Sequence, residues 1–226
     1  ANMTRQVTPI VDEGDVVGHS HRSDAEWESF ADFAQEEINK IAEMKDLTKL
    51  CIGHTNISRL PVLCGSLREI NMAACKSLSS LPDSFCDLSN LETLKLGDGD
   101  IYSGCGKLGS LPEDFGALSS LEHVDMTGCT SVVSLPDSFC LLSNLKKLSL
   151  WYCNELSSLP KQFGQLRSLR ELNMAGCESL LTLPDSFCDL SNLTKLAFGN
   201  ANGHGACCDQ LQSLPQRFGE LNLADL

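Results

Sequence analysis

The sequence predicts an α/β solenoid built from short repeats, with a parallel β-sheet on its concave face and a capping helix at its N-terminal end. Leucine residues recur with one spacing from residue 47 onward, and an amphipathic helical pattern at residues 23–45 precedes them. No single unit of this kind can bury its apolar side alone, so units stack into one continuous core. Leu-Pro dipeptides recur every 24 residues in the centre of the chain, at Leu111, Leu135, Leu159 and Leu183.

Residues 145–169 contain one complete repeat unit. Leu148 and Leu150 alternate along a predicted strand, so both side chains point to the inner face. Cys153 follows three residues later, and further apolar side chains line the return path, namely Leu156, Leu159, Phe163 and Leu166. The same pattern predicts strands at residues 47–52, 67–72, 91–96, 121–126, 145–150, 169–174 and 193–198, with an eighth beginning at 221–226.

Two repeats are longer than the others. Cys105 follows Leu96 by nine residues and Cys208 follows Phe198 by ten, where the regular spacing is three. The inserted residues are rich in Gly, Asp and Asn, so we expect loops at 97–104 and 199–207 that protrude at one edge of the strand row. The outer segments alternate between LPDSFC and LPxxFG, which indicates a duplicated pair of repeats.

The first 46 residues form a separate unit in this interpretation, followed by the repeat domain at 47–226. Ser23 and Glu26 have the spacing of a capping box, which marks the start of a helix. Trp27 and the apolar residues that follow it at helical spacing make one apolar face. We expect this helix to cover the open core of the first repeat, because an uncapped solenoid end exposes apolar surface.

The charge of the chain excludes two classes of partner. A formal net charge of -13 argues against binding to nucleic acid through phosphate neutralisation, and against an anionic membrane surface. The sequence contains no run of 18 or more apolar residues, so we expect no membrane insertion.

Half of the twelve cysteines occupy one position of the repeat, three residues before an inward apolar residue that is nearly always leucine, at Cys75, Cys105, Cys129, Cys153, Cys177 and Cys208. Stacked at the spacing of neighbouring strands, they would form a ladder of small buried thiols. This register favours reduced cysteines and a cytoplasmic protein. A metal site from His204, Cys207, Cys208 and Asp209 is a weaker alternative, because zinc sites need four ligands at defined spacing.

Residues 153–193 (CNELSSLPKQFGQLRSLRELNMAGCESLLTLPDSFCDLSNL) closely resemble the leucine-rich repeats of plant intracellular immune receptors, which combine a nucleotide-binding domain with leucine-rich repeats. The resemblance covers about residues 47–226. It implies a curved right-handed solenoid, or horseshoe, used for recognition or autoinhibition. No nucleotide-binding or signalling domain is present in this sequence, and the interval of 24 residues differs from the shorter units of bacterial secreted effectors.

The candidate binding site lies on the outward side of the predicted strands. Trp151 stands in a column of otherwise small residues, and Tyr152 lies between Gly128 and Gly176 in the neighbouring repeats. An exposed Trp–Tyr pair on a floor of small residues has the character of an interface anchor, although Trp151 packed sideways on a neighbour is the alternative. The complete candidate site is His123, Asp125, Lys147, Trp151, Tyr152, Arg170 and Asn173.

No catalytic motif is present, so we expect a non-enzymatic module without cofactor or metal that binds a protein or peptide on the concave face. The alternative is a structural subunit, held in a larger assembly through the N-terminal segment and the edge loops. A partner that co-purifies in a fixed ratio and survives high salt would favour the subunit.

Overall fold

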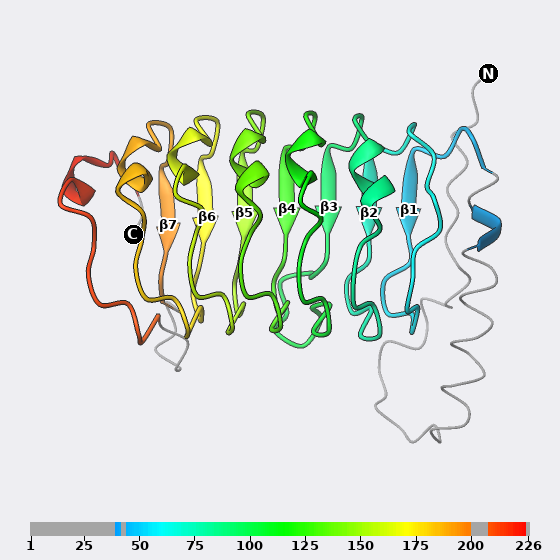
Figure 1. The fold of residues 1–226 in the computed structure, drawn as a ribbon, viewed down its shortest axis with the longest axis horizontal. Coiled ribbons are helices and arrows are strands. Elements are labelled where there is room, and N and C mark those ends of the chain that lie inside the picture. Colours follow the sequence, from blue (N-terminus) through cyan, green and yellow to red (C-terminus); the bar gives the residue numbers. More distant parts are fainter. Residues whose placement is uncertain (1–38, 42–43, 200–207, 225–226) are drawn as a thin grey trace.

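The structure is a computed structural model of the chain, and it describes residues 39–41, 44–199 and 208–224. Seven parallel strands form one open sheet in which sequential neighbours pair (Figure 1). Each strand has three residues, with an outward residue on either side of a buried one, because only the centre of each predicted segment makes a regular ladder. The strands are β1 Lys49–Cys51, β2 Glu69–Asn71, β3 Thr93–Lys95, β4 His123–Asp125, β5 Lys147–Ser149, β6 Glu171–Asn173 and β7 Lys195–Ala197.

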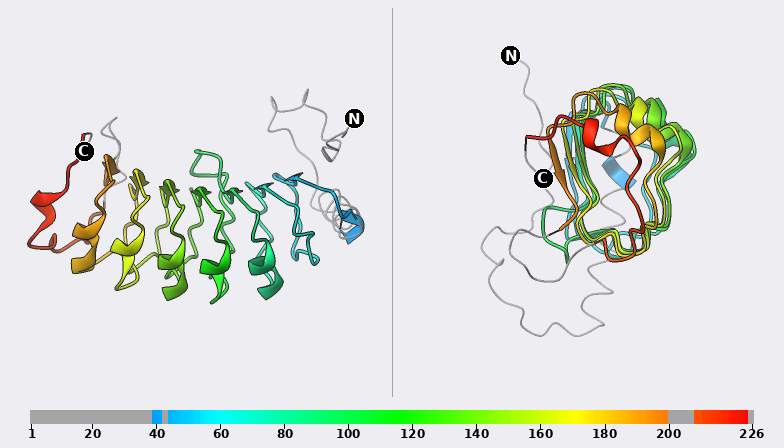
Figure 2. Two further views of the ribbon diagram at one scale, coloured as in Figure 1. Left: turned by 90° about the horizontal axis from the view of Figure 1, so that it is seen from above. Right: turned by 90° about the vertical axis from the view of Figure 1, so that its left-hand side faces the viewer.

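Short 3-10 helices line the side of the solenoid opposite the sheet (Figure 2). Each begins either directly after a Leu-Pro dipeptide or three residues beyond its proline, because proline cannot donate a backbone hydrogen bond and holds the chain extended before the turn. The sequence predicted a return path here, to which no helices were assigned. The helices are η1 Asp83–Asp87, η2 Phe115–Ala117, η3 Asp137–Leu141, η4 Phe163–Gln165, η5 Asp185–Asp189 and η6 Phe218–Glu220.

The core fills the space between the strands and these helices. The inward leucines of the strands are almost fully buried, and each contributes about 1.5–3 kcal/mol of transfer free energy. Phenylalanines from the helix side stack on their neighbours: the ring centroids of Phe115 and Phe139 lie 5.6 Å apart, those of Phe163 and Phe187 lie 6.0 Å apart, and those of Phe187 and Phe218 lie 6.2 Å apart. The repeats are therefore joined by leucines on one side and by aromatic stacking on the other.

The repeats are coupled in pairs on the helix side, and this coupling explains why LPxxFG and LPDSFC segments alternate. The backbone N–H of Gly116 donates to Ser138 Oγ at 3.1 Å, and that of Gly164 donates to Ser186 Oγ at 3.2 Å. A Cβ at either glycine would collide with the carbonyl oxygen of the same serine. Glycine is thus required in one member of each pair so that the next helix can approach closely.

The cysteine ladder predicted from the repeat register is confirmed. Within the described residues all cysteines are free, and the ladder thiols donate to the carbonyl oxygen that follows the strand of the preceding repeat. Sγ–O distances range from 3.1 Å for Cys75 to 4.0 Å for Cys129. Thr55, which the sequence reading missed, occupies this position in the first repeat and donates to the Ile52 carbonyl at 2.7 Å.

The two ends of the array differ in how they are closed. Ile41 is buried in the core at the N-terminal end, and Met44 packs against the same core. Residues 39–41 are helical, but residues 23–38 of the predicted helix, including Trp27, lie outside the described residues, so the division at residue 46 stays a prediction. At the other end no eighth strand forms within the described residues. Ala224 nevertheless donates its backbone N–H to the Thr194 carbonyl at 2.8 Å, so the chain there lies beside the residue before β7.

Candidate functional site

An open groove of about 870 Å³ runs over the solvent side of the sheet from β3 to β7. We call this side, formed by the outward side chains of β1–β7, the sheet face. The groove crosses the strands, so a ligand in it would contact one or two side chains from each repeat. The outward residues that line it are Thr93, Lys95, His123, Asp125, Lys147, Ser149, Glu171, Asn173, Lys195 and Ala197, with Phe198 and Gly199 at one end.

Four of the seven predicted site residues line this groove: His123, Asp125, Lys147 and Asn173. The other three, Trp151, Tyr152 and Arg170, do not. Trp151 follows Ser149 by two residues, beyond the C-terminal end of β5, and Arg170 directly precedes β6. The structure therefore divides the predicted site into a groove and two flanking positions at opposite ends of the strands.

Ion pairs between neighbouring strands neutralise much of the charge on the sheet face. Glu171 accepts from Lys147 at 3.1 Å and from Lys195 at 3.5 Å, which lowers the pKa of Glu171. The remaining pairs are Lys49 with Glu69, Arg68 with Glu92, and Lys146 with Glu122. Exposed pairs of this kind contribute about 0–1 kcal/mol each, so their main effect is on which charges a partner can reach.

The side chains of Asp125 and Asn173 stabilise the turns that follow their strands. Asp125 Oδ1 accepts from the backbone N–H of Thr127 at 2.9 Å, and Asn173 Oδ1 accepts from that of Ala175 at 3.0 Å. Asn71 makes the same contact in the second repeat. Asp and Asn recur here because a short side chain can bond the backbone two residues on and close the turn. Only the second oxygen of Asp125 is left for a partner.

The expectation of an open floor around Trp151 was wrong. Ala73, Thr127 and Ala175 occupy the equivalent position in other repeats, and each is at most 2% exposed. The backbone turns inward there, so these small residues pack against neighbouring repeats instead of facing solvent. Trp151 is half-buried, and its indole Nε1 is buried without a hydrogen-bond partner among the described residues. Burying an unpaired N–H costs about 1–3 kcal/mol.

Tyr152 has a backbone conformation that disfavours its side chain. Its φ is 62°, whereas the equivalent residues Gly128 and Gly176 have φ of 73° and 72°. A left-handed conformation costs a residue with a Cβ about 1–3 kcal/mol, and glycine avoids that cost. The Tyr152 ring makes an edge contact with Trp151, with centroids 6.5 Å apart, so the two aromatic side chains form one unit beside the groove.

His123 faces the groove, as predicted, and has few polar contacts. Its Nε2 lies 4.0 Å from Glu122 Oε2, and its Nδ1 is buried without a hydrogen-bond partner among the described residues. Glu122 is already bound by Lys146 at 2.7 Å, which lowers the pKa of Glu122. His123 is therefore a polar side chain with unused hydrogen-bonding capacity in the groove wall.

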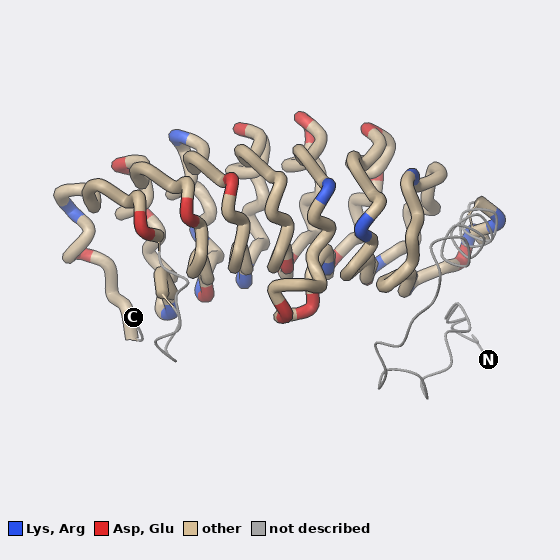
Figure 3. The backbone as a smooth tube through the Cα atoms, turned by 90° about the horizontal axis from the view of Figure 1, so that it is seen from below, with Lys and Arg blue, Asp and Glu red and all other residues tan. Residues whose placement is uncertain are grey.

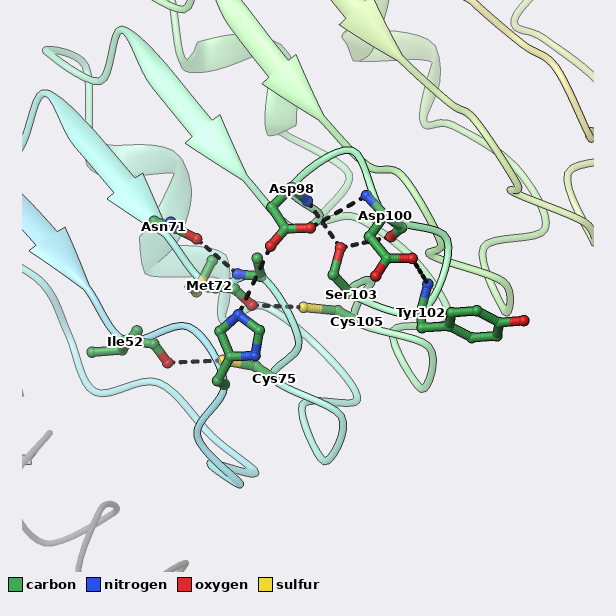
Figure 4. A network of polar contacts seen from close by, with 11 residues as sticks. Ile52, Asn71, Met72, Cys75, Asp98, Asp100, Tyr102, Ser103 and Cys105 are labelled. Atoms are coloured by element: carbon green, nitrogen blue, oxygen red, sulfur yellow. Dashed lines mark hydrogen bonds and ion pairs between the residues drawn. The ribbon is translucent and has the colours of Figure 1, made fainter. Parts of the chain in front are cut away.

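The loop at 97–104 is ordered by its own polar groups (Figure 4). Ser103 is buried; its hydroxyl donates to the Asp100 carbonyl at 2.6 Å and accepts from Asp98 N–H at 3.1 Å. The Ser103 carbonyl accepts from Ala74 N–H, which ties the loop to the preceding repeat. Tyr102 is 76% exposed on this loop. The second predicted edge loop, 199–207, lies outside the described residues except for Gly199.

Within the part of the chain that the structure describes, no group of three or more His, Cys, Asp or Glu side chains could hold a metal ion. Cys208, one member of the weaker metal hypothesis, donates its thiol to the Met174 carbonyl at 3.1 Å. His204 and Cys207 lie outside the described residues. No described helix is both long enough and apolar enough to cross a bilayer.

Comparisons with known proteins agree with this architecture. Residues 168–190 match the family model for the Leucine Rich Repeat. The leucine-rich repeat domain of the type III effector XopL is 22% identical, with a TM-score of 0.53 over 83% of this chain and 71% of that one. A leucine-rich repeat protein of Leptospira interrogans is 20% identical, with a TM-score of 0.41 over 83% of this chain and 58% of that one. No curated protein matches the chain.

At this level of identity the likeness to the XopL domain concerns the fold alone. This chain and that effector domain share the fold although the 24-residue repeat was expected to distinguish them. Nothing in the comparisons bears on the resemblance to plant immune receptors. The parallel sheet, the repeat register and the family match together identify a leucine-rich repeat solenoid, a fold that typically serves in protein interaction.

Proposed function

We propose that this protein is a non-enzymatic recognition module that binds a protein or peptide in the groove of the sheet face. The observation that carries the proposal is the groove itself, which collects side chains from five successive strands on one surface. These side chains differ from strand to strand, whereas the inward residues are apolar throughout and mostly leucine. A surface of this kind can distinguish partners without any change in the core.

Trp151 and Tyr152 are the anchor in this proposal. A half-buried aromatic pair with an unpaired indole N–H can gain a hydrogen bond and bury more apolar area when a partner covers it. The strained backbone of Tyr152 is consistent with a residue kept for binding and not for stability. The resemblance to plant intracellular immune receptors supports a role in defence recognition inside the cell.

The test is capture of partners from an extract of the native source by immobilised wild-type protein, Trp151→Ala and Leu141→Ala. Leu141 is 62% exposed on η3, on the opposite side of the solenoid, so it is a control for the loss of a large apolar side chain away from the sheet face. We expect a partner whose affinity falls at least tenfold with Trp151→Ala, because interface anchors are worth about 2 kcal/mol or more. Leu141→Ala should leave that affinity unchanged.

The result that would refute the proposal is a partner retained by Trp151→Ala, and by Lys147→Glu in the groove, with unchanged affinity. A partner lost only when residues 1–46 are removed would instead favour the structural subunit held through its N-terminal segment. Melting temperatures of all variants show whether a lost partner reflects a lost fold.

A further inference from the structure

The sheet face, counted together with the residue before each strand, has more positive than negative charge, although the whole chain has a net charge of -13. The basic side chains there are Lys49, Arg68, Lys95, Lys146, Lys147, Arg170 and Lys195. The acidic side chains there are Glu69, Glu92, Glu122, Asp125 and Glu171. The rest of the surface is correspondingly more acidic.

The acidic side chains of the sheet face are already engaged. All four glutamates form ion pairs with a lysine or arginine of a neighbouring strand. Asp125 bonds the backbone N–H of Thr127 at 2.9 Å and is the cross-strand neighbour of Lys95, so its charge offsets part of that lysine's. A basic partner would have to displace these contacts before it could pair with a carboxylate on this face.

The positive charges that are left over lie in the groove or beside it. Lys95 and Arg170 form no ion pair with any residue that the structure describes. Lys147 and Lys195 share the single carboxylate of Glu171, so one positive charge of that group is uncompensated. Lys95 stands on β3 and Lys195 on β7, at the two ends of the groove.

We propose that the groove takes an extended acidic peptide segment, with one carboxylate at Lys95 and another at Lys195. This inference rests on the proposed function and specifies the chemistry of its partner. Five strands at the spacing of a β-sheet span about 19 Å. A fully extended chain advances about 3.3–3.6 Å per residue, so roughly six residues cross the groove. Side chains of an extended segment alternate between two faces, so both carboxylates face the groove only at an even separation. They should therefore stand with about five residues between them, at positions i and i+6.

The opposite side of the solenoid is unfavourable for the same ligand, because acidic residues predominate there. After Leu-Pro, four outer turns carry an acidic residue, Asp83, Glu113, Asp137 and Asp185, and two carry a basic one, Lys161 and Arg217. Acidic positions predominate along this row of turns in Figure 3. Like charges suppress wrong contacts, so an acidic segment is directed to the sheet face by attraction there and repulsion elsewhere.

The experiment uses three pools of fluorescein-labelled octapeptides with the same random Leu, Ser, Ala and Tyr positions. The two fixed positions, with five residues between them so that both side chains lie on one face, hold Glu in the first pool, Gln in the second and Lys in the third. Binding is measured by fluorescence anisotropy at low and at physiological salt. We expect the Glu pool to bind about tenfold more tightly than the Gln pool at low salt, and the difference to shrink as salt screens the charges.

Charge-reversal variants locate the site. Lys95→Glu and Lys195→Glu should each weaken the Glu pool at least about fivefold, since each replaces an attraction with a repulsion. Lys76→Glu and Lys161→Glu are matched controls, because both lysines are exposed and neither lines the groove. Both controls should leave the affinity within about twofold, the change expected of a distant surface charge.

Three results would overturn the inference: equal or tighter binding of the Gln or Lys pool, no binding of any pool, or equal losses in the control variants. Failure of the proposed function is a separate outcome. A native partner that is lost with Trp151→Ala while the Glu pool fails would refute the acidic ligand and leave recognition on the sheet face standing.

Discussion

The buried side of this solenoid and its sheet face are built on the same backbone and follow different rules. Inward positions hold leucine, cysteine or phenylalanine in nearly every repeat, and the same hydrogen bond from thiol to carbonyl recurs along the array. Outward positions change from one strand to the next, from Thr93 to His123 to Lys147 along a single row. Every repeat therefore contributes to stability in the same way, whereas the side chains that differ between repeats lie on one surface.

This comparison separates two kinds of substitution. A change on the buried side should alter folding wherever it is made, because each repeat packs on its neighbours. A change on the sheet face should alter binding at its own position and leave folding nearly intact. Substitutions and conditions that act on one side alone can test this separation.

The largest effect is expected from high pH, which acts on the whole cysteine ladder. Burial raises the pKa of Cys75 to about 11 and those of Cys129 and Cys177 to about 12, against an ordinary value of 9.0. Below pH 9.0 both folded and unfolded thiols are protonated, and the stability is complete. Above it the unfolded chain releases protons that the folded chain retains, so the free energy of unfolding falls as pH rises toward 12.

Urea unfolding at a series of pH values measures this decline. Cys177→Thr is the matched variant, because Thr55 already fills the same position in the first repeat. The decline should be shallower in the variant, which lacks one titrating thiol. Identical pH profiles for both proteins would show that the ladder does not govern alkaline unfolding.

The next effect concerns aromatic stacking behind the sheet. Phe139 is fully buried and stacks on Phe115, so Phe139→Ala should lower the free energy of unfolding by about 3–5 kcal/mol. Its ring lies across the core from the sheet face, and peptide binding to the protein that remains folded should be unchanged. A loss of affinity without a loss of stability would contradict the separation of the two sides.

A smaller effect is expected where the two sides meet. Gly128→Ala should destabilise the fold by about 1–3 kcal/mol, because its φ is 73° and a Cβ there would lie 2.5 Å from the Ile101 carbonyl oxygen. Tyr152→Gly, at the equivalent position, should stabilise the fold by about 1 kcal/mol by removing the cost of a left-handed tyrosine. Thermal unfolding of both variants measures this pair, and effects of the same sign would refute the strain at Tyr152.

The smallest effect is expected on the sheet face itself. Lys147→Gln removes an exposed ion pair with Glu171, so the free energy of unfolding should change by no more than about 0.5 kcal/mol. A change of several kcal/mol would mean that the ion pairs of this face stabilise the fold, and that its outward residues are not free to vary.

The repeat register made much of the fold predictable. Inward residues recur at fixed spacing, so the pairing of Leu148 with Leu172 and the ladder position of Cys153 both follow from the sequence. The burial of Thr127 was not predictable, because it depends on the path of the backbone beyond the strand. The contact between the loop at 97–104 and Gly128 joins residues of different repeats through an insertion that breaks the period.

The candidate site was predictable only in part for a similar reason. Alternation along a strand places His123, Lys147 and their neighbours on the sheet face, and four predicted residues line the groove. Which charges are left unpaired depends on side-chain contacts between strands, such as the two lysines that share Glu171. The orientation of the Trp151 indole depends on its rotamer, which spacing does not encode.

The coupling of repeats through Gly116 with Ser138, and Gly164 with Ser186, has a mechanical consequence. A chain pulled from its two ends by an optical trap would yield first at the boundaries between pairs, where this glycine–serine contact is missing. Its length would then increase in steps of two repeats. The same boundaries are the natural places to cut and rejoin the array, so a longer or shorter protein should be assembled from pairs of repeats and not from single ones.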